Sequence, residues 1–166
     1  MTRLNLNNRI YFLTSVTYER KNLFQDPELA QIVEDQWKHY EETYDFKLHA
    51  YAILPDHYHA IIELSGDKDI SQVLYAVNSY SAKLINEGIN QDKARKIWQG
   101  EAFDEVIKSE DMYHEKLAYI LLNPWREGLV DDPFGDYSYG NLSDIKKREG
   151  REFLEDLFSR YSRWSE

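Results

Sequence analysis

Residues 46–64, FKLHAYAILPDHYHAIIEL, contain two runs rich in aliphatic and aromatic side chains, separated by Pro55-Asp56. Runs of this length and composition are typical of strands, and a Pro-Asp pair between them is typical of a tight turn. The stretch therefore predicts a β-hairpin with strands at Phe46–Leu54 and His57–Leu64.

A strand and a helix are predicted upstream of this hairpin. The strand is Ile10–Thr17, which is rich in β-branched and aromatic residues. A helix is expected to begin at Pro27, with Asp26 as its N-cap. Its apolar positions recur at helical spacing and are Leu29, Val33, Trp37, Tyr40 and Tyr44.

Downstream of the hairpin, a second helix is predicted to stop near Gly88. Its expected apolar positions are Ile70, Val73, Leu74, Val77, Tyr80 and Leu84. A short strand is expected at Ala102–Ile107, and a third helix at Asp111–Asn123. The third helix is expected to end there because a residue that precedes a proline, here Pro124, is disfavoured in the α conformation.

The order of these elements predicts an α+β fold. A βαββαβ order is typical of the ferredoxin-like, split-βαβ arrangement, in which two helices cover one face of an antiparallel sheet. The third helix is left to cover the opposite face. We expect one domain over residues 1–166, with a core at about 8–140 and a helical tail at 141–166.

The composition limits the possible functions. The chain has no cysteine, which excludes disulfides and thiolate metal sites. It has no apolar run of about 18 residues and no signal-peptide pattern at its start, so a cytoplasmic protein is expected.

The net charge is −10, which argues against strong non-specific binding to duplex DNA. The charge is uneven, because Glu19–Asp45 has eight acids and three bases whereas Lys83–Trp98 has four bases and two acids. Further bases follow at Arg126 and in the Lys146–Arg148 run. The acidic residues can therefore lie on one face and leave another for a nucleic acid.

His57 and His59 lie two residues apart on a predicted strand, so their side chains leave the same face, opposite to the apolar Tyr58, Ala60 and Ile62. Two imidazoles in this relation can chelate one divalent ion. An HxH pair also occurs by chance, and the alternative is two surface histidines on a half-exposed strand.

Tyr119 and Asn123 lie four residues apart on the third predicted helix, and hence on one face of it. A tyrosine can attack phosphorus and form a covalent phosphotyrosine, and a nearby metal ion would help a phenol to do so. The alternative is that Tyr119 belongs to the helix core and that Asn123-Pro124 only stops the helix.

Two blocks of sequence, taken together, resemble a known family. LHAYAILPDHYHAIIEL, residues 48–64, and IWQGEAFDEVIKSEDMYHEKLAYILLNPWREGLVDDPFGDYSYG, residues 97–140, are similar to the single-tyrosine HUH transposases, and most similar to the REP-associated tyrosine transposases. The resemblance covers roughly residues 8–140. It implies a DNA transposition and recombination enzyme, which nicks single-stranded or hairpin DNA and joins strands through a 5′-phosphotyrosine.

The same resemblance implies the roles of particular residues. His57 and His59 would bind a divalent metal, Mg or Mn, and Asn123 matches the position of a polar third ligand. Tyr119 would be the nucleophile. The chain departs from the family where Asp56 replaces the common Asn before the first histidine, and we expect Asp56 to cap the turn.

The remaining polar and aromatic residues carry weaker predictions. His39, His49 and His114 are explained by surface positions, and Tyr113 is a rival nucleophile without the Asn-Pro context. The candidate DNA-binding residues are Arg95, Lys96, Trp98 and Arg126. Trp98 can stack on an unpaired base, but an ordinary core tryptophan explains it at least as well.

Two other functions compete with this one. A phosphodiesterase with two histidine motifs would need a second His-x-Ser/Thr motif, which the sequence lacks. A domesticated nucleic-acid-binding protein that keeps the fold without cutting is favoured by the charge of −10 and opposed by the joint presence of His57, His59, Tyr119 and Asn123. The sequence leaves open whether the protein is a monomer or a homodimer.

Overall fold

The computed structural model describes residues 4–89 and 94–161. The elements follow in the order β1 (Ile10–Val16), α1 (Pro27–Thr43), β2 (Phe46–Leu54), β3 (His57–Leu64), α2 (Ile70–Gly88), β4 (Phe103–Val106), α3 (Glu110–Arg126), α4 (Leu142–Glu149) and α5 (Arg151–Tyr161). Two short 3₁₀ turns, Tyr18–Arg20 and Leu23–Gln25, connect β1 to α1.

The four strands form one antiparallel sheet in the order β2-β3-β1-β4. Because β3 lies between β1 and β2, the first βαβ unit is split, as the sequence predicted. The hairpin of β2 and β3 closes where Leu54 pairs with His57. Its turn is held from outside, since the Pro55 carbonyl accepts from the Phe24 N–H and the Asp56 carbonyl accepts from the Thr17 N–H.

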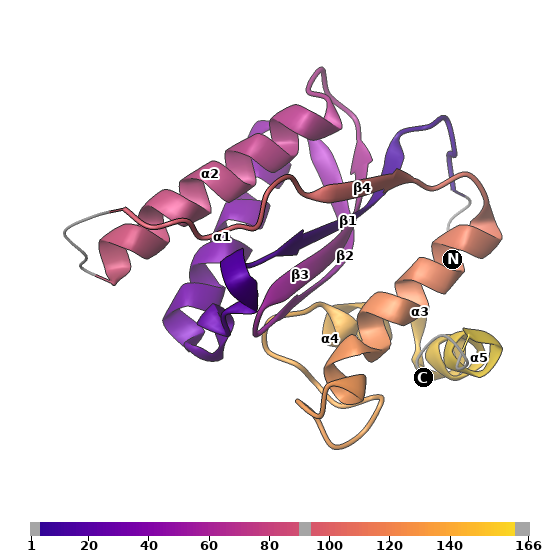
Figure 1. Ribbon diagram of the computed structural model, residues 1–166. Coiled ribbons are helices and arrows are strands. Elements are labelled where there is room, and N and C mark those ends of the chain that lie inside the picture. Colours follow the sequence, from indigo (N-terminus) through magenta and orange to yellow (C-terminus); the bar gives the residue numbers. More distant parts are fainter. Residues whose placement is uncertain (1–3, 90–93, 162–166) are drawn as a thin grey trace.

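Helices cover both faces of the sheet (Figure 1). Helices α1 and α2 pack on one face, around buried residues such as Trp37, Tyr58 and Val77. Helices α3, α4 and α5 lie on the opposite face, where Ile61 and Leu117 belong to a second core. The predicted α+β class, with two helices on one face and α3 on the other, is confirmed.

The N-terminal end of α1 is capped as the sequence predicts, and α2 has an N-terminal cap as well. The Asp26 carboxylate accepts the Glu28 N–H, with Pro27 in the first turn of α1. The start of α2 has a capping box, in which Asp69 and Gln72 each accept the other's backbone N–H.

The predicted apolar stripe of α2 is wrong in its second half. Tyr80 is 51% exposed, whereas Ile85 is fully buried. The buried face continues from Val77 through Ser81 to Ile85, at spacings of four. Because Ser81 is polar, the sequence pattern does not indicate that the buried face continues through it. In the structure its hydroxyl lies 3.2 Å from the indole nitrogen of Trp98 and so has a partner in the core.

The predicted end of α3 is also wrong, because the helix continues past Pro124 to Arg126. A proline disturbs the helical turn that precedes it. Pro124 lies near the end of α3, so only the last turn of the helix follows it. That turn is closed by the Glu127 N–H, which donates to the Asn123 carbonyl at 3.0 Å. Gly128, at φ +74°, then ends the helix.

The predicted helical tail contains two short helices, α4 and α5, joined at Gly150. Among the residues that the structure describes, no helix has both the length and the apolar character needed to cross a membrane.

Candidate active site

Strand β3 places His57 and His59 on the sheet face that α3 covers. Their side chains are almost fully buried, and their ring centroids lie 4.8 Å apart. The alternative of two surface histidines is therefore wrong. Two adjacent buried imidazoles need partners or a ligand, and each ring has one nitrogen with a clear partner.

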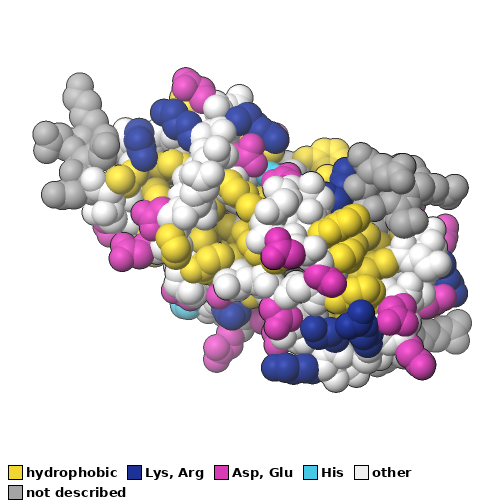
Figure 2. Space-filling view, turned by 90° about the horizontal axis from the view of Figure 1, so that it is seen from below, with side chains coloured by type: hydrophobic (Ala, Val, Ile, Leu, Met, Phe, Trp, Pro, Cys, Tyr) yellow, Lys and Arg dark blue, Asp and Glu magenta, His cyan; other side chains and the backbone are white. Residues whose placement is uncertain are grey.

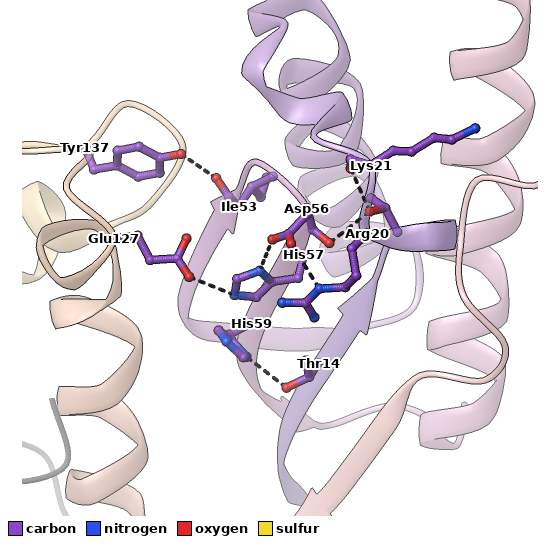
Figure 3. A network of polar contacts seen from close by, with 10 residues as sticks. Thr14, Arg20, Lys21, Ile53, Asp56, His57, His59, Glu127 and Tyr137 are labelled. Carbon is purple, nitrogen blue, oxygen red and sulfur yellow. Dashed lines mark hydrogen bonds and ion pairs between the residues drawn. The ribbon is translucent and has the colours of Figure 1, made fainter. Parts of the chain in front are cut away.

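The ring of His57 is oriented by Asp56 (Figure 3). The Nδ1 atom of His57 lies 2.7 Å from Oδ1 of Asp56, whose other oxygen pairs with Nε of Arg20 at 3.0 Å. A carboxylate can only accept, so Nδ1 carries the proton when the ring is neutral, and Nε2 has a free lone pair. The carboxylate of Asp56, from which we expected a cap of the turn, thus orients His57 and pairs with Arg20.

His59 is oriented by Thr14, whose hydroxyl oxygen lies 2.8 Å from Nδ1 (Figure 3). Its Nε2 atom is buried and has no hydrogen-bond partner among the described residues. Burial, and after it the positive charge of a protonated His57, lower the pKa of His59 to about 3. The ring is therefore neutral at physiological pH, and its unpartnered nitrogen is suited to binding a cation.

Glu127 approaches His57 from the end of α3 (Figure 3). Its Oε1 atom is 4.0 Å from Nε2 of His57. The possible ligand atoms of Asp56, His57 and Glu127 all lie within 4.8 Å of one another. The sequence interpretation missed Glu127 because it ended α3 at Asn123. Gly128, a typical residue just after a helix end, was the available signal.

Tyr119 packs directly against this cluster. Its ring meets that of His59 edge-on, with centroids 5.0 Å apart, and meets that of Phe12 at 6.1 Å. The guanidinium of Arg126 lies 5.6 Å from the centroid of the Tyr119 ring. The predicted nucleophile is only partly buried, and the structure brings it together with His59, one of the two predicted ligand histidines, and with Arg126.

Asn123, the predicted third ligand, is buried on α3 one turn after Tyr119. Glu127 follows one further turn along. Residues at a spacing of four share a face of a helix, so Tyr119, Asn123 and Glu127 form one row. Helix α3 packs on β2 and β3, the two strands of the hairpin that carries His57 and His59.

The rival nucleophile Tyr113 is held in a different polar cluster. It is 4% exposed, and its hydroxyl lies 2.9 Å from Nδ1 of His49. Burial raises the pKa of Tyr113 to about 12, which disfavours its ionised form. The surface position predicted for His49 is wrong, because its ring is buried between Tyr113 and Glu63.

The other predicted DNA-binding residues are not all surface groups. Trp98 is 8% exposed, and its N–H donates to the Asn78 carbonyl at 3.1 Å. It is therefore a core residue that is not available to stack on a base. Lys96 is exposed and lies 5.2 Å from the Tyr18 ring centroid, and Arg95 is half-buried.

Acidic and basic side chains are mixed on one face of the molecule. In the face that Figure 2 shows, Asp and Glu side chains are scattered among Lys and Arg side chains and hydrophobic patches. The expected separation of acidic and basic faces does not hold there.

Curated relatives with sequence similarity are REP-associated tyrosine transposases. One, from Haemophilus influenzae, is 27% identical over 149 residues, which cover 82% of each chain. Another, from Escherichia coli, is 28% identical over 97 residues, which cover 55% of this chain and 54% of the relative.

Solved structures of transposases share the fold. The structure of a REP-associated tyrosine transposase bound to a REP hairpin matches with a TM-score of 0.71 and 21% identity, over 90% of this chain and 86% of that one. A Deinococcus radiodurans protein described as a transposase matches with a TM-score of 0.52 and 20% identity, over 67% of this chain and 87% of that one.

The family itself is decided by the match to a family model. The family model described as "Transposase IS200 like" matches residues 5–120, which include both strands of the hairpin and α3 as far as Ile120. The chain therefore belongs to the IS200-like transposase family.

Proposed function

We propose that this protein cuts single-stranded DNA by forming a covalent bond between Tyr119 and a 5′ phosphate, and that it rejoins strands by the reverse step. The observation that carries the proposal is the contact of the Tyr119 ring with His59, whose Nε2 is buried without a partner. A nucleophile beside a nitrogen atom that can bind a cation is an arrangement suited to phosphoryl transfer.

In the proposed step, the phenolic oxygen of Tyr119 attacks phosphorus and forms a P–O bond. The bond from phosphorus to the 3′ oxygen of the preceding nucleotide breaks. The phenol loses its proton, and the leaving 3′ oxygen gains one to become a hydroxyl. The phosphodiester energy is kept in the phosphotyrosine, so a 3′ hydroxyl can attack it and restore the DNA strand.

The proposed cofactor is a divalent ion, Mg or Mn, held by His57, His59 and an oxygen ligand from α3. The orphaned Nε2 of His59, and the Nε2 of His57 facing Glu127, fit such an ion. Asn123 remains the proposed neutral ligand, and Glu127 is a second, charged candidate. When bound, the ion would polarise the phosphate and offset its charge.

Asp56 and Thr14 fix the orientation of the two imidazoles, and Arg126 places a positive charge near the nucleophile. Asp56 and Thr14 each engage an Nδ1 atom, so both rings direct Nε2 away from that contact. The guanidinium of Arg126, near the Tyr119 ring, can stabilise negative charge on the phenolate or on the phosphate.

The proposed substrate is single-stranded or hairpin DNA. Support comes from the structural relative that is bound to a REP hairpin and from the net charge of −10, which suits a site with few phosphate contacts. A protein that binds such DNA without cutting it is the second candidate, and the same charge favours it.

The deciding experiment compares three conservative variants. Purified protein is incubated with Mn and labelled hairpin-bearing single strands, and the adduct that survives SDS is measured. Tyr119→Phe should abolish the adduct, whereas Tyr113→Phe and the control Tyr75→Phe, at a 76% exposed residue of α2, should retain it. Tyr119→Phe keeps almost all the packing, so it should fold.

Peptide mapping of the wild-type adduct completes the test. The labelled nucleotide should be on the peptide that contains Tyr119. Label on the Tyr113 peptide would refute the nucleophile assignment. Tight binding of the strand by wild-type protein with no adduct at all would instead establish the non-cutting candidate.

A further inference from the structure

An open groove of about 400 Å³ runs beside the candidate active site, between β1, β4 and α3. Tyr119 and His59 form one part of its lining, and Phe103 of β4 forms another. The volume lies within the range of small-ligand clefts, about 300–1,000 Å³. A ligand in this groove would contact the predicted nucleophile directly.

Phe103 is unusual because it is 55% exposed on a short edge strand. Its partner in the sheet is Thr14, whose hydroxyl orients His59. Residues paired across two strands point to the same face, so Phe103 presents its ring on the side of the active site. The nearby Phe12 ring is buried, and it lines the groove as well.

The groove has charges of both signs. The Lys116 amine lies 3.7 Å from a Glu105 oxygen and 4.8 Å above the Phe12 ring centroid, and Glu115 also lines the groove. A phosphate would meet these carboxylates as well as the amine, which disfavours it. A neutral planar ring with hydrogen-bonding edges is compatible with both charges and with the aromatic walls.

We propose that this groove binds one unpaired nucleobase of the DNA strand, next to the phosphate at Tyr119, and that the base stacks on Phe103. The inference rests on the proposed function and names a subsite of it. An unpaired base has free faces for stacking, whereas a base within a duplex has both faces covered by its neighbours. The groove therefore selects single strands and sets the position of the strand at Tyr119.

The test measures binding of short labelled single strands in the Tyr119→Phe background, which prevents cutting. One probe has mixed sequence, and the other has the same sugar-phosphate backbone without bases. Phe103→Ala should weaken binding of the mixed-sequence strand about tenfold, and should leave the base-free strand unaffected. Phe103→Trp should restore binding, because a larger ring also stacks.

Tyr75→Ala is the matched control, since it removes an exposed aromatic ring from α2. It should leave binding of both strands unchanged. In addition, strands containing 5-iododeoxyuridine should cross-link to the peptide Ile97–Lys108, which holds Phe103.

Equal binding of the mixed-sequence strand by Phe103→Ala and its parent would overturn the proposed subsite. An equal loss of affinity for both probes would also overturn it. So would a parent protein that binds the two probes equally well. These results differ from failure of the proposed function, which is judged by the Tyr119 adduct of wild-type protein. An adduct with no effect of Phe103→Ala rejects the groove alone, whereas base-dependent binding without an adduct rejects cutting alone.

Discussion

At the scale of single residues, the site is prepared by what each histidine is bonded to. Asp56 and Thr14 occupy the Nδ1 atoms of His57 and His59, so the remaining nitrogens are the only free ligand atoms of the pair. Such outer contacts orient metal-binding imidazoles, and removing one typically reduces metal affinity by about 10- to 100-fold. The strand alone would place the two rings without fixing their rotation.

The identity of the oxygen ligand gives a prediction at this scale. Glu127→Gln should weaken Mn binding at least tenfold, because the variant replaces a charged oxygen 4.0 Å from His57 Nε2 with a neutral amide. Calorimetric titration of Mn gives the affinity, and Glu28→Gln, at an exposed residue of α1, is the control. If only Asn123→Ala weakens binding, Asn123 is the ligand and Glu127 is not.

A second prediction concerns His49, whose ring is buried outside the candidate site. Burial lowers the pKa of His49 below its ordinary value of 6.5, and the hydrogen bond to Glu63 opposes this effect. The native state therefore keeps His49 neutral, with Nε2–H donating to Glu63 and Nδ1 accepting from the Tyr113 hydroxyl. The other charged groups around it are Lys47, Arg148 and Glu149.

The stability contributed by a neutral His49 is present above pH 6.5. Below pH 6.5, His49 gains a proton in the unfolded chain but not in the native state. The free energy of unfolding therefore decreases as pH falls from 6.5 toward the lower native pKa. In His49→Gln this decrease should be smaller, by about 1.4 kcal/mol for each unit of pKa shift. Urea unfolding from pH 8 to pH 4 measures it, and parallel curves for both proteins would contradict the assignment.

At the scale of elements, α3 and the hairpin together make the site. The hairpin supplies His57 and His59 at a fixed spacing, and α3 supplies Tyr119, Asn123 and Glu127 as one row along its length. The turn of α3 beyond Pro124 matters because it extends this row to Glu127. The position of the hairpin also depends on how closely the segment just after β3 approaches the C-terminal end of α1.

A third prediction tests this approach at Gly66. A Cβ atom on Gly66 would lie 2.7 Å from the Tyr44 carbonyl oxygen. The N–H of Gly66 already donates to the Asp45 carbonyl at 2.8 Å. Gly66→Ala should therefore lower the free energy of unfolding by about 1–3 kcal/mol, since backbone must shift. Gly88→Ala, where nothing lies within 4 Å of the added Cβ, should be neutral or stabilising. Equal urea midpoints for Gly66→Ala and the parent protein would show that the end of α1 shifts without a loss of stability.

At the scale of the whole molecule, the sheet has both faces covered and the net charge is strongly negative. Acidic side chains are scattered over the face in Figure 2, so no uniformly basic surface for duplex DNA is visible there. A protein of this kind is expected to bind DNA through a few local contacts rather than through its overall field. Arg126 and the groove at Phe103 are the proposed contacts.

A fourth prediction follows for DNA binding. Single-stranded or hairpin DNA should bind more tightly than blunt duplex of the same sequence. The slope of log affinity against log salt for the single strand should be no steeper than about −2, which corresponds to about three phosphate contacts. Titrations at several salt concentrations measure both quantities. Tighter duplex binding with a steep slope would show that a basic surface dominates.

The sequence by itself determined the order of the elements, the α+β class, the family and the shared face of His57 and His59. The strands of the hairpin were predicted to the residue. These features are local, because side-chain alternation, helical spacing and turn chemistry act over a few neighbouring residues. The row of Tyr119 and Asn123 on α3 was visible for the same reason.

Only the tertiary structure decided which side chains meet across elements. It buried His49 and Trp98, exposed Tyr80, brought Glu127 to His57, and left Phe103 open beside Tyr119. None of these follows from local spacing, because each depends on packing between segments that are distant in the chain. The continuation of α3 past Pro124 is the clearest case. The local preference against a helix there is weaker than the packing of α3 on the sheet, and that packing carries Glu127 to the candidate site.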